Sequence, residues 1–182
     1  SYQYKVPALV VRACNIYGPG DLNFTRLIPK TIMCLLSGKS PQINKGSETV
    51  LREYIYVGDV VDSYLFLMEK VSDYYGKDNC NMPRSGKSTY GWAAFNVGSY
   101  NKEDIKNLEN CKNIRNVVQV IDFLKSKILD VDSVIKEKPA NFIEIPDQYN
   151  NSFKIIELGF KPKVNFEEGI NRSIEWYKDN YD

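Results

Sequence analysis

The sequence has no histidine, and none of its four cysteines forms a C-x-x-C pair. The missing histidine excludes a Ser-His-Asp triad and a Cys-His nucleophile. It also makes a zinc site improbable, because zinc is bound mainly by Cys and His. An unpatterned set of cysteines favours free buried thiols in a reducing compartment over a disulfide framework. We therefore expect a cytoplasmic protein without a metal centre.

Charge of one sign and long apolar runs are also lacking. Lys and Arg number 24 against 23 Asp and Glu, and a net charge of +1 gives no field to hold a polyanion, so nucleic acid is not an expected partner. No apolar run approaches the roughly 20 residues that span a bilayer, and residues 1–5 do not resemble a signal peptide. The sequence predicts a soluble chain with no membrane partner.

Phosphate-binding loops are excluded by their missing glycines. Gly-Lys-Ser occurs at residues 38–40 and 86–88, but Met33 and Asn81 stand where the first glycine of a nucleoside triphosphate loop is required. The Gly-Pro-Gly run at 18–20 lacks the third glycine of a dinucleotide fingerprint, and its proline removes a backbone donor. We interpret that run as a turn.

What is present has the order of an α/β protein. Residues 8–11 form a continuous aliphatic run, typical of a parallel strand buried on both faces, and residues 93–98 predict a second such strand. Periodicity and caps predict helices at 26–38, 114–129, 152–158 and 166–177. A β-rich run at 53–57 precedes a helix capped by Asp59, with Val60, Val61, Tyr64, Leu65, Met68 and Val71 on its apolar face. Polar residues 73–92 predict a surface insertion.

Four polar side chains stand near the ends or starts of these elements: Asn15, Arg26, Arg52 and Asn96. Ligands of open α/β sheets bind at the carboxyl ends of strands, and arginine can bind phosphate through two donors. Taken singly, the arginines are typical surface residues and Asn15 can be explained as closing a turn. Their combined order favours an anion site.

The motifs Arg12–Asp21, Arg26–Pro29, Arg52–Asp59 and Phe95–Gly98 occur in an order and spacing that resemble nucleotide-sugar epimerases and dehydratases. These are extended short-chain dehydrogenases/reductases. Residues 157–162, 166–169 and 174–177 resemble the same family's last two helices, so the likeness covers nearly the whole chain. Within the family, residues 20–29 are most similar to CDP-glucose 4,6-dehydratases.

The resemblance implies an α/β chain that holds the last strands of a Rossmann-type parallel sheet and the small carboxy-terminal substrate domain. Strands near 8–14 and 93–98 would belong to the sheet, and 20–60 plus 130–182 would form most of the substrate domain. The implied ligand is a nucleoside-diphosphate sugar, and the implied cofactor of the parent protein is NAD.

The resemblance also assigns residues. Asn15 would lie where sugar and diphosphate meet, and Arg52 would face the phosphates. Asn96 would contribute to the same site. Ala13 and Cys14 would lie near the nicotinamide. The residues implied to line the nucleotide pocket are Arg26, Leu27, Ile28 and Ile43. The resemblance places no catalytic residue in this chain.

Two departures qualify this reading. The family's glycine-rich loop and Tyr-x-x-x-Lys pair are absent, because no Tyr is followed four residues later by Lys. Pro146 and Asp147 stand where Arg and His are common, which predicts a lost phosphate contact. We therefore expect a carboxy-terminal fragment of an NAD-dependent 4,6-dehydratase, a lyase, that is inactive alone. Such parents oxidise the sugar at C4 with NAD, eliminate water across C5 and C6, and return the hydride to C6.

Three alternatives stay open at this level. The chain could be part of a nucleotide-sugar 4-epimerase, or an unrelated structural domain. It could also be a non-catalytic nucleotide-sugar binder or a subunit that pairs with a separate amino-terminal half. Half a sheet would leave an open edge beside residues 8–11, with apolar surface and unpaired backbone. That edge predicts a homodimer, a rearrangement, or pairing with the missing half.

Overall fold

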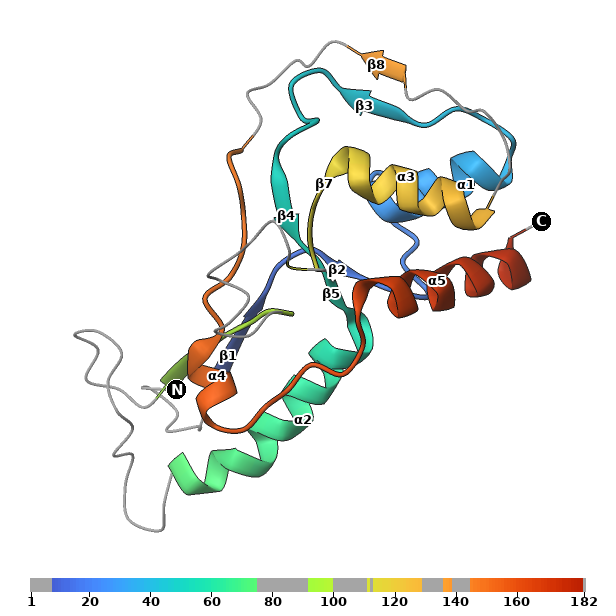
Figure 1. Ribbon diagram of the computed structural model, residues 1–182. Coiled ribbons are helices and arrows are strands. Elements are labelled where there is room, and N and C mark those ends of the chain that lie inside the picture. Colours follow the sequence, from blue (N-terminus) through green and yellow to red (C-terminus); the bar gives the residue numbers. More distant parts are fainter. Residues whose placement is uncertain are drawn as a thin grey trace.

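The computed structural model describes residues 8–74, 92–99, 111, 113–128, 136–138 and 145–181 (Figure 1). They form an α/β fold of short strands and five helices within the described ranges. The expected surface insertion falls largely outside these ranges, and only its two ends are described. No helix in the described ranges is long and apolar enough to cross a bilayer.

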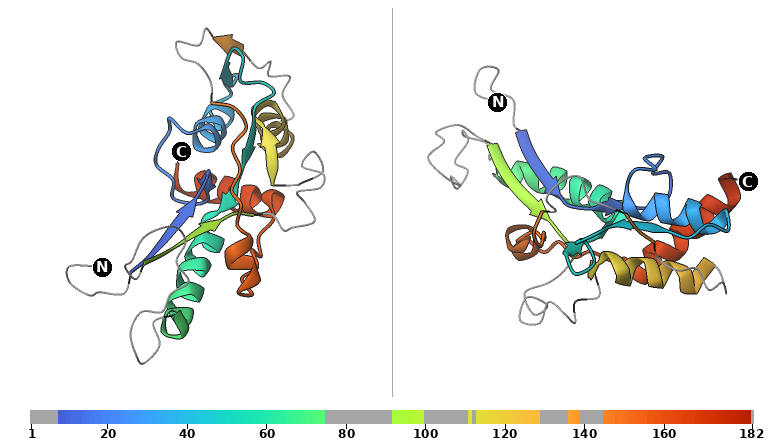
Figure 2. Two further views of the ribbon diagram at one scale, coloured as in Figure 1. Left: turned by 90° about the vertical axis from the view of Figure 1, so that its left-hand side faces the viewer. Right: turned by 90° about the horizontal axis from the view of Figure 1, so that it is seen from above.

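The strand over the first aliphatic run is parallel, as predicted. The expectation that it is buried on both faces is wrong, because within the described residues each of its side chains is only partly buried or exposed. β1 (Ala8–Ala13) pairs in parallel with β6 (Trp92–Val97), from Ala8 opposite Trp92 to Ala13 opposite Val97. Two helices, α2 (Val57–Tyr74) and α4 (Phe153–Glu157), flank this pair (Figure 2). The core between them contains Ile55, Val60, Leu67, Phe95, Val97, Ile155 and Phe160.

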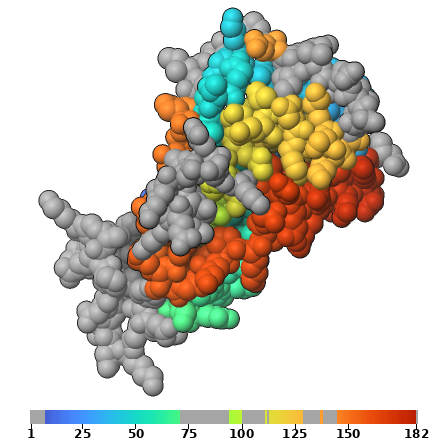
Figure 3. All heavy atoms as spheres, in the orientation of Figure 1, coloured from blue at the N-terminus to red at the C-terminus, as the bar shows by residue number. Residues whose placement is uncertain are grey.

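A second core lies among three other helices, α1 (Leu27–Leu36), α3 (Val117–Ile128) and α5 (Phe166–Asn180). On one face of the molecule α3 and α5 lie against each other (Figure 3). Tyr17 and Tyr54 join this core from the strands, and both rings contact Phe166. The buried helix residues are Ile28, Ile32, Leu35, Val120, Leu124, Phe166, Ile170, Ile174 and Tyr177.

Short strand pairs connect the two cores. β2 (Ile16–Tyr17) runs parallel to β5 (Ile55–Tyr56), and β4 (Leu51–Glu53) runs antiparallel to β7 (Ile114–Asn116). A third pair, β3 (Gln42–Asn44) with β8 (Lys136–Lys138), is parallel. The domain limits expected from the resemblance stay a prediction.

Several helix limits differ from those expected. The helix expected at 114–129 begins only at Val117, because residues 114–116 pair with β4. At its start the side-chain oxygens of Asn116 and Gln119 each accept a hydrogen bond from the backbone N–H of the other residue. Asp59 does not cap its helix, which already begins at Val57. Its buried carboxylate instead accepts hydrogen bonds from the backbone N–H groups of Lys163 and Val164. At the other end of the chain, α5 continues to Asn180.

Most of the apolar residues that the sequence predicts on the core-facing side of α2 are exposed instead. Val60 is buried, but Val61, Tyr64, Leu65 and Met68 are 48%, 45%, 54% and 68% exposed. The helix has two apolar sides, and the side with Val60, Ser63 and Leu67 faces the β1–β6 pair. Beside it, β1 bonds only β6 within the described ranges, and Val10 is 42% exposed. An apolar surface is therefore present beside β1.

This surface predicts self-association. Burying one large aliphatic side chain contributes about 1.5–3 kcal/mol, so Leu65→Gln should raise the dissociation constant of a dimer about 10-fold or more, as measured by sedimentation velocity. Leu22→Gln, at a leucine of similar exposure outside α2, should leave the constant unchanged. A chain that is monomeric at every concentration contradicts the prediction.

The contact between β2 and α5 requires a glycine. A Cβ atom at Gly169 would lie 2.3 Å from the Tyr17 hydroxyl and 2.9 Å from a ring carbon of Tyr56. Gly169→Ala should therefore lower the free energy of unfolding by about 1–3 kcal/mol through overpacking, despite alanine's higher helix propensity. Asn171→Ala, on an exposed position of the same helix, should change it by less than about 0.5 kcal/mol. Urea titration with an unchanged m-value measures both, and equal stabilities would contradict the packing argument.

Candidate functional site

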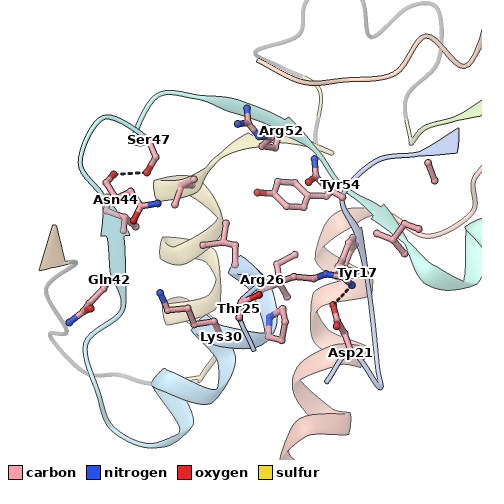
Figure 4. Close-up of a pocket in the computed structure, with 18 residues that line it drawn as sticks. Tyr17, Asp21, Thr25, Arg26, Lys30, Gln42, Asn44, Ser47, Arg52 and Tyr54 are labelled. Carbon is pink, nitrogen blue, oxygen red and sulfur yellow. Dashed lines mark hydrogen bonds and ion pairs between the residues drawn. The ribbon is translucent and has the colours of Figure 1, made fainter. Parts of the chain in front are cut away.

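A cavity of about 690 Å³ opens where β1 ends, between α1, β3, β4 and the start of α3 (Figure 4). Gln42, Asn44 and Ser47 lie on its β3 side, and Arg26 and Asp21 lie across from them. Its volume is within the range of small-molecule sites. The lining residues are Ala13, Asn15, Ile16, Tyr17, Asp21, Thr25, Arg26, Leu27, Ile28, Pro29, Lys30, Gln42, Ile43, Asn44, Ser47, Arg52, Tyr54 and Val117.

The structure brings most of the expected site residues together at this cavity. Those that line it are Ala13, Asn15, Arg26, Leu27, Ile28, Ile43 and Arg52. Cys14 and Asn96 do not. The Cys14 thiol donates to Glu53 Oε2 at 3.3 Å, and the Asn96 amide donates to the Asn151 carbonyl at 3.0 Å. Both side chains therefore form hydrogen bonds within the protein beside the cavity.

Asn15 has the most unusual backbone of the set, with a φ of 42° in the left-handed region that asparagine tolerates better than most residues. Its carbonyl accepts a hydrogen bond from the Ile55 N–H at 3.3 Å. Its side-chain Nδ2 is buried and has no hydrogen-bond partner among the described residues. Leaving a buried donor unpaired costs about 1–3 kcal/mol.

The charges around the cavity favour an anion. Arg26, Lys30 and Arg52 line it, against the single carboxylate of Asp21. Arg26 Nη1 lies 3.1 Å from Asp21 Oδ2, and the Arg26 side chain remains 58% exposed. An exposed ion pair of this kind contributes little and leaves donors of the guanidinium group available.

Arg52 is held by a distant part of the chain. Its guanidinium group donates to the Ile145 carbonyl at 2.8 Å and to the Pro146 carbonyl at 3.0 Å. Residues 145–150 run beside β4 with a parallel bridge between Arg52 and Gln148, and the Asp147 carboxylate accepts from the Leu51 N–H at 2.8 Å. The sequence positions that depart from the family pattern therefore provide acceptors for residues 51 and 52.

Two buried tyrosines, Tyr17 and Tyr54, line the cavity. Burial raises the pKa of Tyr54, and the nearby Arg52 charge only partly opposes this rise. Burial also raises the pKa of Tyr17, whose hydroxyl donates to the Phe166 carbonyl at 3.2 Å. Both phenols therefore stay protonated at neutral pH. They suit binding and packing rather than proton abstraction.

The described residues offer little to a metal or a dinucleotide. Within these ranges no group of three His, Cys, Asp or Glu side chains could hold a metal ion. Burial, followed by the nearby Glu53 charge, raises the pKa of Cys14, so its thiol is not a ready nucleophile. Of the two residues expected near a nicotinamide, only Ala13 lines the cavity.

The sequence did not predict eleven of the eighteen residues that line the cavity. Tyr54 stands two positions after Arg52 in the quoted motif, and residues at that spacing in an extended chain lie on the same side, which is a usable signal. Lys30 lies one helical turn after Arg26. Gln42, Asn44 and Ser47 had no comparable signal, and neither had Val117, which was expected inside a helix rather than at its first residue.

Comparison with known proteins adds the context of a family. Residues 1–82 match the model of the NAD dependent epimerase/dehydratase family. The dTDP-D-glucose 4,6-dehydratase of Homo sapiens is 28% identical over 181 residues, covering 98% of this chain and 44% of the human enzyme. The chain thus spans less than half the length of that relative.

Solved structures show the same fold. A UDP-glucose 4-epimerase with UDP-glucose from Thermotoga maritima superposes with a TM-score of 0.73 at 23% identity, over 100% of this chain and 49% of that one. A UDP-glucose 4-epimerase from Thermus thermophilus in complex with NAD gives 0.66 at 17% identity, over 98% and 49%. The chain has the Rossmann-like α/β fold of the corresponding part of these epimerase structures, one of which contains UDP-glucose and the other NAD.

Proposed function

We propose that this chain provides the substrate-binding part of an NAD-dependent nucleotide-sugar 4,6-dehydratase. The observation that carries the proposal is the cavity at the carboxyl end of β1, where three cationic side chains and Asn15 line one space. Such a set suits a ligand that is both anionic and rich in hydrogen-bond acceptors.

The diphosphate, the sugar and the base of a nucleoside-diphosphate sugar each have suitable side chains in the cavity. The diphosphate would be bound by Arg26, Lys30 and Arg52, and the Asn15 amide would donate where diphosphate and sugar meet. An aromatic base has apolar wall available at Ile28, Ile43, Tyr54 and Val117. The polar side chains on the β3 side, Gln42, Asn44 and Ser47, can bond the edges of the base or the ribose.

The dehydratase reaction is supported by the similarity to the human dTDP-D-glucose 4,6-dehydratase, whose name specifies dTDP as the nucleotide of its substrate. The similarity of residues 20–29 to CDP-glucose 4,6-dehydratases remains a prediction for the choice of base. NAD would supply hydride acceptance at the sugar C4 and hydride return at C6. The described residues alone do not form its binding site, since only Ala13 is placed for it, so we assign this chain the binding and orientation of the sugar nucleotide.

A nucleotide-sugar 4-epimerase is the second candidate, favoured by the Thermotoga maritima structure. The residues at the cavity bind substrate and do not choose between these reactions. With the full-length parent protein, mass spectrometry separates them: a dehydratase product is lighter by one water, whereas an epimerase product has an unchanged mass. A binding subunit without catalysis would change neither.

The anion site can be tested through Arg26. Arg26→Ala should weaken binding of a nucleoside-diphosphate sugar about 10-fold to 100-fold, because a hydrogen bond to a charged group contributes about 1.5–3 kcal/mol. Calorimetric titration with CDP-glucose, dTDP-glucose and UDP-glucose measures it and identifies the preferred base, with NAD as a control ligand. Arg26 is the better test position because Arg52 also holds residues 145 and 146.

Arg172→Ala is the matched control, since Arg172 pairs with Glu168 on α5 and does not line the cavity. Its affinity for the sugar nucleotide should equal that of the unmodified chain. Equal losses in both variants, or no loss in Arg26→Ala, would place the anion elsewhere.

Asn15 allows a test of the unpaired amide without strain. Asn15→Gly keeps a residue that adopts positive φ readily, so the fold should persist while the donor is lost. Affinity for the nucleotide sugar should fall about 10-fold, the effect of one hydrogen bond of about 1.4 kcal/mol. Unchanged affinity, with an unchanged circular dichroism spectrum, would mean that Nδ2 does not meet the ligand.

A further inference from the structure

We propose that Glu53 is a positioning residue of the nucleotide-sugar cavity, because its buried carboxylate holds the end of β1, which carries two cavity residues, against the end of β6 and the segment that binds Arg52. The proposal rests on the proposed function for its ligand. Glu53 does not line the cavity itself. It stands between two residues that do, Arg52 and Tyr54.

The carboxylate is fully buried, with 0% exposure of Glu53, and is surrounded by donors. Oε2 accepts from the Asn150 N–H at 2.8 Å and from the Cys14 thiol at 3.3 Å. Oε1 accepts from the Ser99 N–H at 2.5 Å and from the Ser99 hydroxyl at 3.2 Å. The donors thus come from the end of β1, the end of β6 and residues 145–150.

Two of the donors are connected to the cavity, one directly through its neighbours in the chain and one through the segment that binds Arg52. Cys14 stands between Ala13 and Asn15, which both line it. Asn150 ends the segment whose carbonyls at 145 and 146 hold the Arg52 guanidinium group. The Asn150 side chain also donates to the Arg12 carbonyl at 3.2 Å and the Val97 carbonyl at 3.4 Å, so this segment is fixed to β1 and β6 as well. Glu53 therefore sets the separation of Asn15 and Arg52.

The surroundings of Glu53 are built for a carboxylate. A Cβ atom at Gly98 would lie 2.3 Å from Oε1, so only glycine leaves room for the oxygen. Both oxygens face backbone N–H groups, and a glutamine would turn an amide NH₂ toward one of them. Glu53→Gln thus preserves the size of the side chain and removes one acceptor. A role in packing alone would not require this chemistry.

The test compares Glu53→Gln with Leu67→Val, a substitution in the β1–β6 core away from the cavity. Both variants are titrated with the nucleotide sugar that binds best, at a temperature where near-ultraviolet circular dichroism shows them folded. Glu53→Gln should weaken binding about 10-fold, and Leu67→Val should leave it unchanged. Equal affinities of the Glu53→Gln variant and the unmodified chain, or equal losses in both variants, would overturn the proposal.

Amide hydrogen exchange makes the test independent of ligand binding. In Glu53→Gln, exchange should accelerate at the amides of Ser99 and Asn150 and stay unchanged within α2. If the unmodified chain binds no nucleotide sugar, the proposed function fails, and the exchange data still decide whether Glu53 holds the segments. Unchanged protection at both amides would overturn that role even where binding is observed.

Discussion

A carboxylate buried away from water requires hydrogen-bond donors from the protein itself. The donors to the buried Glu53 carboxylate come from three segments of this chain. An ionised side chain without them would be expelled or neutralised. Burial does raise the pKa of Glu53, and the N–H groups of Asn150 and Ser99 oppose that rise. The ends of β1 and β6 and residues 145–150 must therefore lie where the carboxylate can bond them. The positions of Asn15 and Arg52 follow from this constraint.

The alternation of a strand explains how one cavity lies between two cores. Tyr54 and Ile55 are adjacent in the chain, and their side chains point in opposite directions. Tyr54 enters the core of α1, α3 and α5, whereas Ile55 enters the core between β1, β6 and α2. The segment 51–56, which comprises β4, Tyr54 and β5 and contributes to both cores, also carries Arg52. Polar groups gather at this junction because neither core covers it completely.

The sequence predicted those features that depend on neighbours in the chain. The aliphatic run of β1, its parallel pairing, the turn after Asn15 and the helix after Arg26 all have local signals, and the structure confirms them. The limits of α3 were wrong because residues 114–116 have a helical pattern, yet pair with a strand more than 60 positions away. The inward side of α2 was wrong because its apolar residues cover two sides of the helix. For the site, motif resemblance found side chains at the cavity, but nothing local reveals that Cys14 turns to Glu53 or that residues 145–150 hold Arg52.

The hydrogen bonds between β4 and residues 145–150 join positions 93 to 97 apart in the sequence. During synthesis on the ribosome, α1 and its strands emerge long before these partners exist. Until then the Arg52 guanidinium group is solvated by water, because its carbonyl partners have not been synthesised. The Glu53 carboxylate cannot be buried with its donors until Asn150 has left the exit tunnel. The wall of the cavity thus cannot be completed before residues 145–150 are made, and an amino-terminal nascent chain has the ligand-facing side chains without the geometry that makes them a site.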